Sequence, residues 1–198
     1  MTAALLLSGG MDSTALAYWM RPQVAITIAY GQRCAVGEID AASAVCAQLS
    51  IKHEVIHVDC SALGSGDLSD RPALSIAPVT EWWPFRNQLL ITLAAMRALE
   101  HGISEMMIGS VRNDAAHCDG RAEFFAALSR VMEQQEGALR VSAPAIHLTS
   151  TELVRASKIP MSVLAWAHSC HVADFACGRC RGCNKHSETM SELGLERE

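Results

Sequence analysis

A run of small and hydroxyl-bearing residues near the start of the chain has the composition of a phosphate-binding loop. It reads Ser8-Gly9-Gly10-Met11-Asp12-Ser13-Thr14, after the apolar run 3–7 and before the helix-compatible stretch 15–20. The glycines can take backbone angles that are closed to other residues, and Asp12 or Ser13 can cap the helix that follows. Amide groups of such a turn and of a helix N-terminus converge on one anion. We therefore expect a buried strand, a phosphate loop and a helix.

Two common nucleotide-binding fingerprints do not fit this loop. No Lys follows the glycines as Gly-x-x-x-x-Gly-Lys-Ser/Thr requires, and the run lacks Gly-x-Gly-x-x-Gly. A Gly-Gly pair is more often an ordinary turn before a helix. Here an apolar run, hydroxyl groups and a helical pattern coincide with it, which favours phosphate binding.

Four of the eight cysteines lie within fourteen residues, in the segment 170–183. They are Cys170, Cys177, Cys180 and Cys183, and the short loops Cys-Gly-Arg-Cys and Cys-Arg-Gly-Cys each contain a Gly that allows a tight turn. A tetrahedral zinc site needs such loops to bring four thiolates within about 2.3 Å of one ion. The spacing predicts a structural zinc site.

Other uses of these cysteines stay open. Cys-x-x-Cys-x-x-Cys also occurs in iron–sulfur ligation, but the Pro that often follows such a run is missing here. A disulfide pair is disfavoured, because no secretory signal peptide is present and a cytosolic setting keeps thiols reduced. His168, His171 or His186 could replace one cysteine, although four thiolates already complete a structural shell.

Composition indicates an ordinary compact enzyme. Hydrophobic residues make up 50% of the 198 residues, and the formal net charge is −5. We expect a main domain over residues 1–165 and a small zinc-binding segment over 166–198. The acidic charge argues against nucleic acid as a bulk partner, although Arg179 and Arg181 form a local basic patch. No apolar run is long enough to span a bilayer, so we expect no membrane partner and a cytoplasmic location.

Between the two ends, strand and helix patterns alternate. Apolar runs predict strands at 24–30, 54–58 and 106–109, and helical spacing predicts helices at 38–49, 87–101 and 122–136. Thr149 and Glu152 form a capping box for a helix that ends before Pro160. The segment 61–80 contains several Gly and Pro residues and is expected to be a long loop, either a cover of the active site or disordered.

This order predicts an α/β fold, a doubly wound and mainly parallel sheet covered by helices on both faces. Ligands of such sheets bind at the carboxyl ends of the strands. The segments expected to form the site are therefore 8–14, 30–34 and 109–119.

The loop 8–13 resembles the Ser-Gly-Gly-x-Asp-Ser pyrophosphate loop of the PP-loop ATP pyrophosphatases, which have an adenine nucleotide alpha hydrolase-like fold. Four further segments are similar, in the same order, to the QueC family of 7-cyano-7-deazaguanine synthases. They are Tyr30-Gly31-Gln32-Arg33 with Glu38-Ile39-Asp40, the segment Pro84-Phe85-Arg86-Asn87-Gln88-Leu89-Leu90, Ile108-Gly109 with Asn113-Asp114 and Asp119-Gly120-Arg121-Ala122-Glu123-Phe124, and Ser169-Cys170 with the cysteine segment 177–183. Five motifs in one order span nearly the whole chain.

The resemblance implies an ATP-dependent C–N ligase that adenylylates 7-carboxy-7-deazaguanine, couples it to ammonia and dehydrates the amide to a nitrile. It also implies ATP, Mg and Zn as cofactors and a homodimer. The residues that match the family's ATP site are Leu7, Ser8, Gly9, Gly10, Asp12, Ser13, Thr14, Tyr30, Gly31, Gln32 and Gly109. Those that match its substrate site are Arg86, Asn87, Asn113, Asp114, Asp119 and Arg121.

Four of these residues are the expected catalytic group, namely Asp12, Ser13, Arg33 and Arg86. Asp12 can hold magnesium, which prefers carboxylate and phosphate oxygens. The two arginines can clamp a phosphate or a carboxylate, because a guanidinium stays charged and bonds in a planar fork. A carboxylate can accept the paired donors of a guanine-like edge, so Asp114 or Asp119 is expected to contact the base.

The chain departs from the family pattern around the substrate site. It has Ala115-Ala116-His117-Cys118-Asp119-Gly120-Arg121 where the family has an aromatic-Ser-Gly-Tyr-Pro-Asp-Cys-Arg run, and His171 and His186 stand where Tyr and Arg are usual. A second function therefore stays open, that of the QueC-like enzymes of antiphage (antiviral defence) systems, which link the activated carboxylate to an amine of a partner protein. A non-catalytic zinc-ribbon binding module is a third hypothesis, which the intact loop 8–14 disfavours.

Overall fold

Alternate residues of the first strand enter two hydrophobic cores. In β1 (Ala3–Leu6), Ala4 and Leu6 face the core that contains Ile91, whereas Leu5 belongs to the core that contains Leu153. Because side chains alternate across a strand, an all-apolar strand must be covered on both faces. The apolar run 3–7 thus reflects a central strand between two layers of helices.

The computed structural model, which describes residues 2–195, contains a five-stranded sheet in the order β3-β2-β1-β4-β5. Each neighbouring pair of strands is parallel. The remaining strands are β2 (Val24–Ala29), β3 (Lys52–His57), β4 (Glu105–Ile108) and β5 (Arg140–Ser142). The parallel α/β fold expected from the sequence is confirmed.

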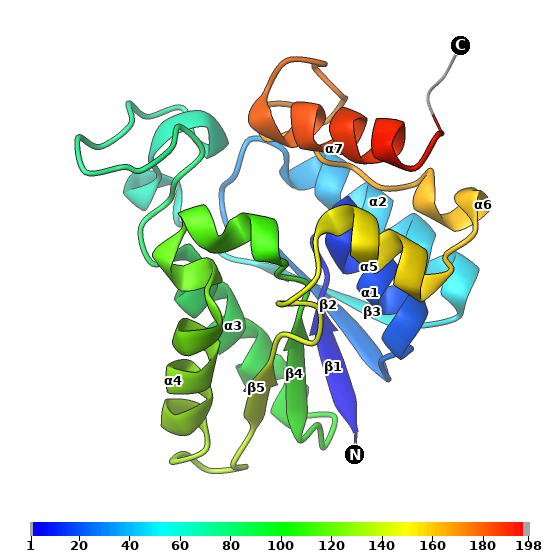
Figure 1. Cartoon of the computed structure of the whole chain (residues 1–198). Helices are drawn as coiled ribbons and strands as arrows, with labels where there is room; N and C mark the ends of the chain where they lie inside the picture. The colour runs from blue at the N-terminus through cyan, green and yellow to red at the C-terminus, as the bar shows by residue number, and fades with distance from the viewer. Residues whose placement is uncertain (1, 196–198) are drawn as a thin grey trace.

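Helices cover both faces of the sheet (Figure 1). On one face lie α3 (Arg86–Leu99) and α4 (Ala122–Met132), and on the other lie α1 (Met11–Met20), α2 (Ala35–Leu49), α5 (Ser150–Ser157) and α6 (Met161–Leu164). The helix α7 (Arg181–Glu192) contacts α5 and lies across the carboxyl ends of the strands (Figure 1). Short 3-10 turns occur at Ser61–Leu63, Gly66–Leu68, Arg112–Ala116 and Cys118–Gly120.

The strand order places a reversal of the chain at β1. From β1 the chain continues to β2 and β3 on one side, and it then crosses to β4 and β5 on the other. A crevice forms outside the carboxyl ends of two strands whose connections run in opposite directions. The phosphate loop follows β1 and Gly109 follows β4, so both border this crevice.

Several local predictions were wrong. The first residue before α1 is Gly10, without a side-chain cap, so neither Asp12 nor Ser13 caps that helix. The strand β5 was missed because Val141 is its single apolar residue, and α7 was missed because its sequence is mostly polar. The helix expected over 122–136 ends at Met132.

The long loop expected over 61–80 is confirmed, since this segment is irregular apart from two short 3-10 turns.

Within residues 2–195, no helix combines the length and the apolar character that a membrane span requires.

The expected division into a main domain over residues 1–165 and a zinc-binding segment over 166–198 stays a prediction.

The predicted capping box of α5 is confirmed and can be tested. Thr149 Oγ1 accepts a hydrogen bond from the Glu152 amide at 3.2 Å, and Glu152 Oε2 accepts one from the Thr149 amide at 2.7 Å. We expect Thr149→Ala to lower the free energy of unfolding by about 1 kcal/mol, measured by urea denaturation. Thr149→Ser keeps the acceptor oxygen and should unfold like the wild type. Equal stability of Thr149→Ala and the wild type would contradict the role of the cap.

Candidate active site

The phosphate loop folds into a tight turn held by its own hydroxyl groups. Gly9 has a φ of +74°, which glycine adopts without strain. Ser13 Oγ donates to the Gly10 carbonyl at 3.0 Å and lies 3.2 Å from Ser8 Oγ. The His168 amide donates to the Gly9 carbonyl at 2.9 Å, so the segment before the cysteines also holds the turn.

Neighbouring backbone packs against this loop so closely that only glycine fits. A Cβ at Gly9 would lie 2.7 Å from the Glu38 carbonyl oxygen, and a Cβ at Gly109 would lie 2.8 Å from the Cα of Ser13. The end of β4 therefore supports the first turn of α1 directly.

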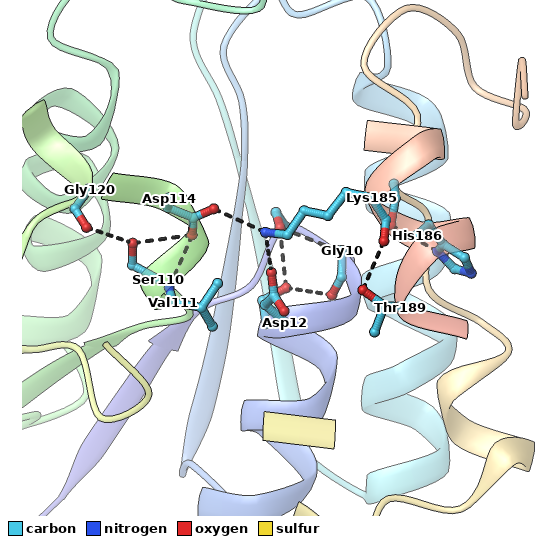
Figure 2. A network of polar contacts seen from close by, with 12 residues as sticks. Gly10, Asp12, Ser110, Val111, Asp114, Gly120, Lys185, His186 and Thr189 are labelled. Carbon is cyan, nitrogen blue, oxygen red and sulfur yellow. Dashed lines mark hydrogen bonds and ion pairs between the residues drawn. The ribbon is translucent and has the colours of Figure 1, made fainter. Parts of the chain in front are cut away.

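The ammonium group of Lys185 lies between two carboxylates at the mouth of the loop (Figure 2). It approaches Asp12 Oδ2 at 2.9 Å and Asp114 Oδ1 at 3.0 Å. Burial lowers the pKa of Lys185, but the two carboxylates outweigh this effect and raise it above its ordinary value. The lysine comes from α7, Asp12 from α1 and Asp114 from the turn after β4, so one cation joins three separate segments.

Asp12 keeps one oxygen without a partner. Its Oδ1 is buried and has no hydrogen bond within the described chain, although the carboxyl group also lies near Ser150. Burial raises the pKa of Asp12, and Lys185 offsets this only in part. A second cation at Oδ1 would stabilise the charged carboxylate.

Arg86 occupies the middle of the site, at the first position of α3. Burial lowers its pKa, but Tyr30, Asp119 and Glu38 nearby raise it above the ordinary value. Both oxygens of Glu38 are already engaged, one by Gln32 Nε2 at 2.8 Å and one by the Cys34 thiol at 3.4 Å. Arg86 therefore keeps its positive charge in this buried position.

A second charged group lies at Glu81. Its Oε1 is 2.8 Å from Arg181 NH1 and 3.6 Å from His117 Nε2. Burial raises the pKa of Glu81, but His117, a backbone amide and Arg181 outweigh it and lower the pKa to about 2. The carboxylate is therefore ionised at neutral pH.

One pocket of about 640 Å³ joins these groups. Most of the residues that the sequence predicted for the site line it. They are Leu7, Ser8, Gly10, Asp12, Ser13, Tyr30, Gly109, Arg86, Asn87, Asn113 and Asp114. Glu38, Glu81, His171, Arg181 and Lys185 line it as well.

The other predicted residues lie outside the lining. Gly9 and Thr14 hold the loop from behind, since Thr14 Oγ1 donates to the Gly9 carbonyl. Gly31 and Gln32 form the turn after β2. The side-chain amide of Gln32 donates to the Ile28 carbonyl and to the Glu38 carboxylate. Arg33 points to the 61–80 segment and pairs with Asp70 at 3.5 Å.

The two remaining residues also make internal bonds. Asp119 Oδ2 accepts from the Asn87 amide at 3.2 Å, and Arg121 Nε donates to the Ala115 carbonyl at 3.0 Å. These contacts position α3 and the loop after β4. The structure thus does not bring Arg33, Asp119 or Arg121 to the pocket wall.

Sequence reasoning missed Lys185 and Glu81 as site residues. Each is a single charged residue in a segment without a recognised spacing, and Lys185 reaches the loop from 171 or more positions away along the chain. The available signal for Lys185 was its place two residues after Cys183. A cysteine cluster that holds the start of a helix also holds the residues of its next turn in position.

The cysteine cluster has the geometry of a metal site. The Sγ atoms of Cys170, Cys177, Cys180 and Cys183 all lie within 4.8 Å of one another. Pairs at 3.9 Å and 4.0 Å agree with the edge of about 3.8 Å that a tetrahedron with 2.3 Å bonds requires. Backbone amides of Arg179 and Cys180 lower the pKa of the Cys177 thiol to about 6, which favours the thiolate. His168 and His186 bond to Ala173 and Ser169, and neither belongs to the cluster.

Comparison with known proteins identifies close relatives in sequence. Residues 2–194 match the family described as Queuosine biosynthesis protein QueC. A 7-cyano-7-deazaguanine synthase of Thiobacillus denitrificans is 35% identical, with 98% of this chain and 95% of that protein aligned. A protein of the same name from Laribacter hongkongensis is 30% identical, with 98% and 91% aligned.

A solved structure shares the fold at much lower sequence identity. The U34-tRNA thiolase NcsA from Methanococcus maripaludis, with its [4Fe-4S] cluster, aligns with a TM-score of 0.55 and 16% identity. The alignment covers 96% of this chain and 65% of the thiolase. At this identity the likeness supports the fold alone.

The four-cysteine cluster predicts a bound metal ion. Elemental analysis of purified protein should find about one zinc per chain. Cys180→Ser should lose the ion and much of its solubility, because structural zinc contributes folding free energy directly. Cys118→Ser, at an exposed cysteine outside the cluster, should keep the ion. Visible absorption of an iron–sulfur chromophore, or full stability after chelation, would contradict zinc.

Proposed function

The chain belongs to the QueC family, and from that premise we propose that it adenylylates 7-carboxy-7-deazaguanine with ATP and converts it, with ammonia, to the nitrile 7-cyano-7-deazaguanine. One observation carries the proposal. A phosphate loop, a buried arginine and a buried carboxylate with an unpartnered oxygen all border a single pocket at the reversal point of the sheet.

The physical problem is the stability of a carboxylate. It is anionic, it is a poor electrophile, and its oxygen leaves badly until a phosphate is attached. In the first step the carboxylate oxygen attacks the α-phosphorus of ATP, the bond to the bridging oxygen breaks, and pyrophosphate leaves. The loop amides and the hydroxyl groups of Ser8 and Ser13 would hold the leaving pyrophosphate. Arg86 would neutralise the reacting carboxylate and the α-phosphate, which otherwise repel each other.

The site also fits a magnesium ion. Asp12 Oδ1 is buried and unpartnered, and magnesium is usually bound through one or two carboxylates together with phosphate oxygens. Asp12 would hold the ion, which supplies charge neutralisation on the phosphates. Lys185 lies on the other oxygen of the same carboxylate and keeps its orientation.

The next steps build the amide and then the nitrile. Ammonia attacks the acyl carbon of the adenylate, AMP leaves and a proton is released. The amide oxygen then attacks the α-phosphorus of a second ATP and pyrophosphate leaves, after which loss of AMP and of both amide protons leaves the carbon–nitrogen triple bond. The same phosphate loop would serve both activations, because each requires an oxygen nucleophile at the same α-phosphorus.

A second candidate differs only in the acceptor. The chain would transfer the activated acyl group to an amine of a partner protein, as in the QueC-like antiphage systems, and would stop at the amide. His117 and His171, which stand at the positions that depart from the family pattern, both line the pocket and give this alternative its support. The mass of the product formed with ammonia, compared with the mass of a candidate partner protein, distinguishes a nitrile from a protein-linked amide.

Zinc in the four-cysteine cluster would hold the start of α7. Cys183, a member of the cluster, lies in the first turn of α7, and the side chain of Cys180, another member, accepts from the Cys183 amide. We also propose that the protein acts as a homodimer, which sedimentation of the purified chain would test.

Loss of the phosphate loop groups should abolish the first step. We expect Asp12→Asn and Ser13→Ala each to reduce carboxylate-dependent pyrophosphate release by roughly 100-fold or more, because they remove groups that act on developing phosphate charge. Far-UV circular dichroism should be unchanged. Glu136→Gln, at an exposed position after α4, should release pyrophosphate at the wild-type rate. Wild-type turnover of either loop variant would remove the assignment of the loop.

Removal of the Lys185 charge should weaken the same step. We expect Lys185→Met to lower kcat/KM for ATP by about 10- to 100-fold, in line with the loss of charged hydrogen bonds. Lys158→Met, at an exposed position after α5, is the matched control. Lys185→Arg keeps the charge and should retain more activity than Lys185→Met. Equal kinetics of Lys185→Met and the control would show that the contact is structural only.

A further inference from the structure

The two carboxylates first considered for the base, Asp114 and Asp119, are poorly placed to receive it. Asp119 Oδ2 accepts from the Asn87 amide, and Asp119 does not line the pocket. Asp114 lines it, but its Oδ1 binds Lys185 at 3.0 Å and its Oδ2 accepts from the Val111 amide at 3.0 Å. Asp119 therefore does not face a ligand in the pocket, and both oxygens of Asp114 already accept bonds that support the site.

Glu81 is different, because one of its oxygens has nothing to bind. The residue is 4% exposed and lines the pocket. Its Oε1 bonds to Arg181, whereas its Oε2 is buried and has no hydrogen-bond partner within residues 2–195. An ionised oxygen that is buried without a donor is costly, and ligand sites are where such an atom finds its partner.

The wall beside Glu81 carries a second open polar atom. His171 Nδ1 is also buried without a hydrogen-bond partner in the described chain, and His171 lines the same pocket. Glu81 and His171 thus both bring a buried, unpartnered polar atom to the wall of one pocket. Arg181 and His117 both contact Oε1 of Glu81, which leaves Oε2 as the open acceptor.

We propose that Glu81, in place of Asp114 or Asp119, is the residue that recognises the base of the substrate, by accepting hydrogen bonds from its N1–H and 2-amino edge. This inference rests on the proposed function, since it assumes a 7-deazaguanine carboxylate. The edge presents neighbouring N–H donors, which match an unpartnered carboxylate oxygen of a residue that lines the pocket. The carboxyl end of the substrate would then extend toward Arg86 and the phosphate loop, which border the same pocket.

The adenylation half-reaction tests the proposal without ammonia. ATP–pyrophosphate exchange is measured with 7-carboxy-7-deazaguanine and with its analogue that lacks the 2-amino group. We expect Glu81→Gln to raise the KM for 7-carboxy-7-deazaguanine by about 10- to 100-fold, the range for lost charged hydrogen bonds, and to leave the KM for ATP unchanged. The wild-type preference for the substrate over the analogue should largely disappear, because a site that bonds an N–H group rejects the analogue without it.

Two variants control for structure. Glu136→Gln changes an exposed glutamate outside the pocket and should keep the wild-type preference. Glu81→Asp keeps the charge but shortens the side chain, and it replaces Glu81→Gln as the test if the latter fails to fold. Its KM for 7-carboxy-7-deazaguanine should lie between the wild-type value and the value expected for Glu81→Gln. A role of Glu81 in folding alone would lower the amount of active enzyme and would not change the preference between the two substrates.

Three results overturn the proposal. They are an unchanged preference in Glu81→Gln, an effect confined to the KM for ammonia in the complete reaction, and loss of the preference in Asp119→Asn with Glu81→Gln unaffected. Absence of exchange in the wild type with 7-carboxy-7-deazaguanine is a separate outcome, because it refutes the proposed function itself.

Discussion

The close approach of backbone segments around the phosphate loop is the constraint on which the site depends. Gly9 lies against the Glu38 carbonyl and Gly109 lies against Ser13, and neither position has room for a side chain. The first turn of α1, the start of α2 and the end of β4 are therefore fixed relative to one another. The phosphate loop and Asp12 can therefore face a ligand from a framework whose parts have little freedom to move.

Electrostatics then joins the C-terminal segment to this centre. The ammonium group of Lys185 neutralises Asp12 and Asp114, and the guanidinium of Arg181 neutralises Glu81. Both cations come from the first five residues of α7, directly after Cys180. The cysteine cluster thus has a role beyond local stability, because it determines where these two charges enter the pocket.

The sequence was sufficient to predict elements and motifs that follow a regular spacing. It was insufficient to predict single residues that reach the site from a distant part of the chain. Several features follow a periodicity or a spacing with a direct physical meaning. They are the apolar runs at 3–7 and 24–30, the phosphate loop, the capping box at Thr149 and the four cysteines. Glu81 and Lys185 have no such pattern, since their position depends on how an irregular segment and a polar helix fold over the strands. Arg33 shows the reverse case, because its motif placed it near the site but its side chain turns toward Asp70.

The position of α7 in chain order has a consequence for synthesis on the ribosome. All five strands and the phosphate loop precede Cys170, so the sheet can assemble before the cysteines and Lys185 have been made. During that interval the nascent chain carries Asp12 and Asp114 near each other without the cation that separates them in the finished protein. Capture of the metal ion and closure of α7 would therefore be late events, and a nascent chain that lacks them would expose the nucleotide crevice in an inactive form.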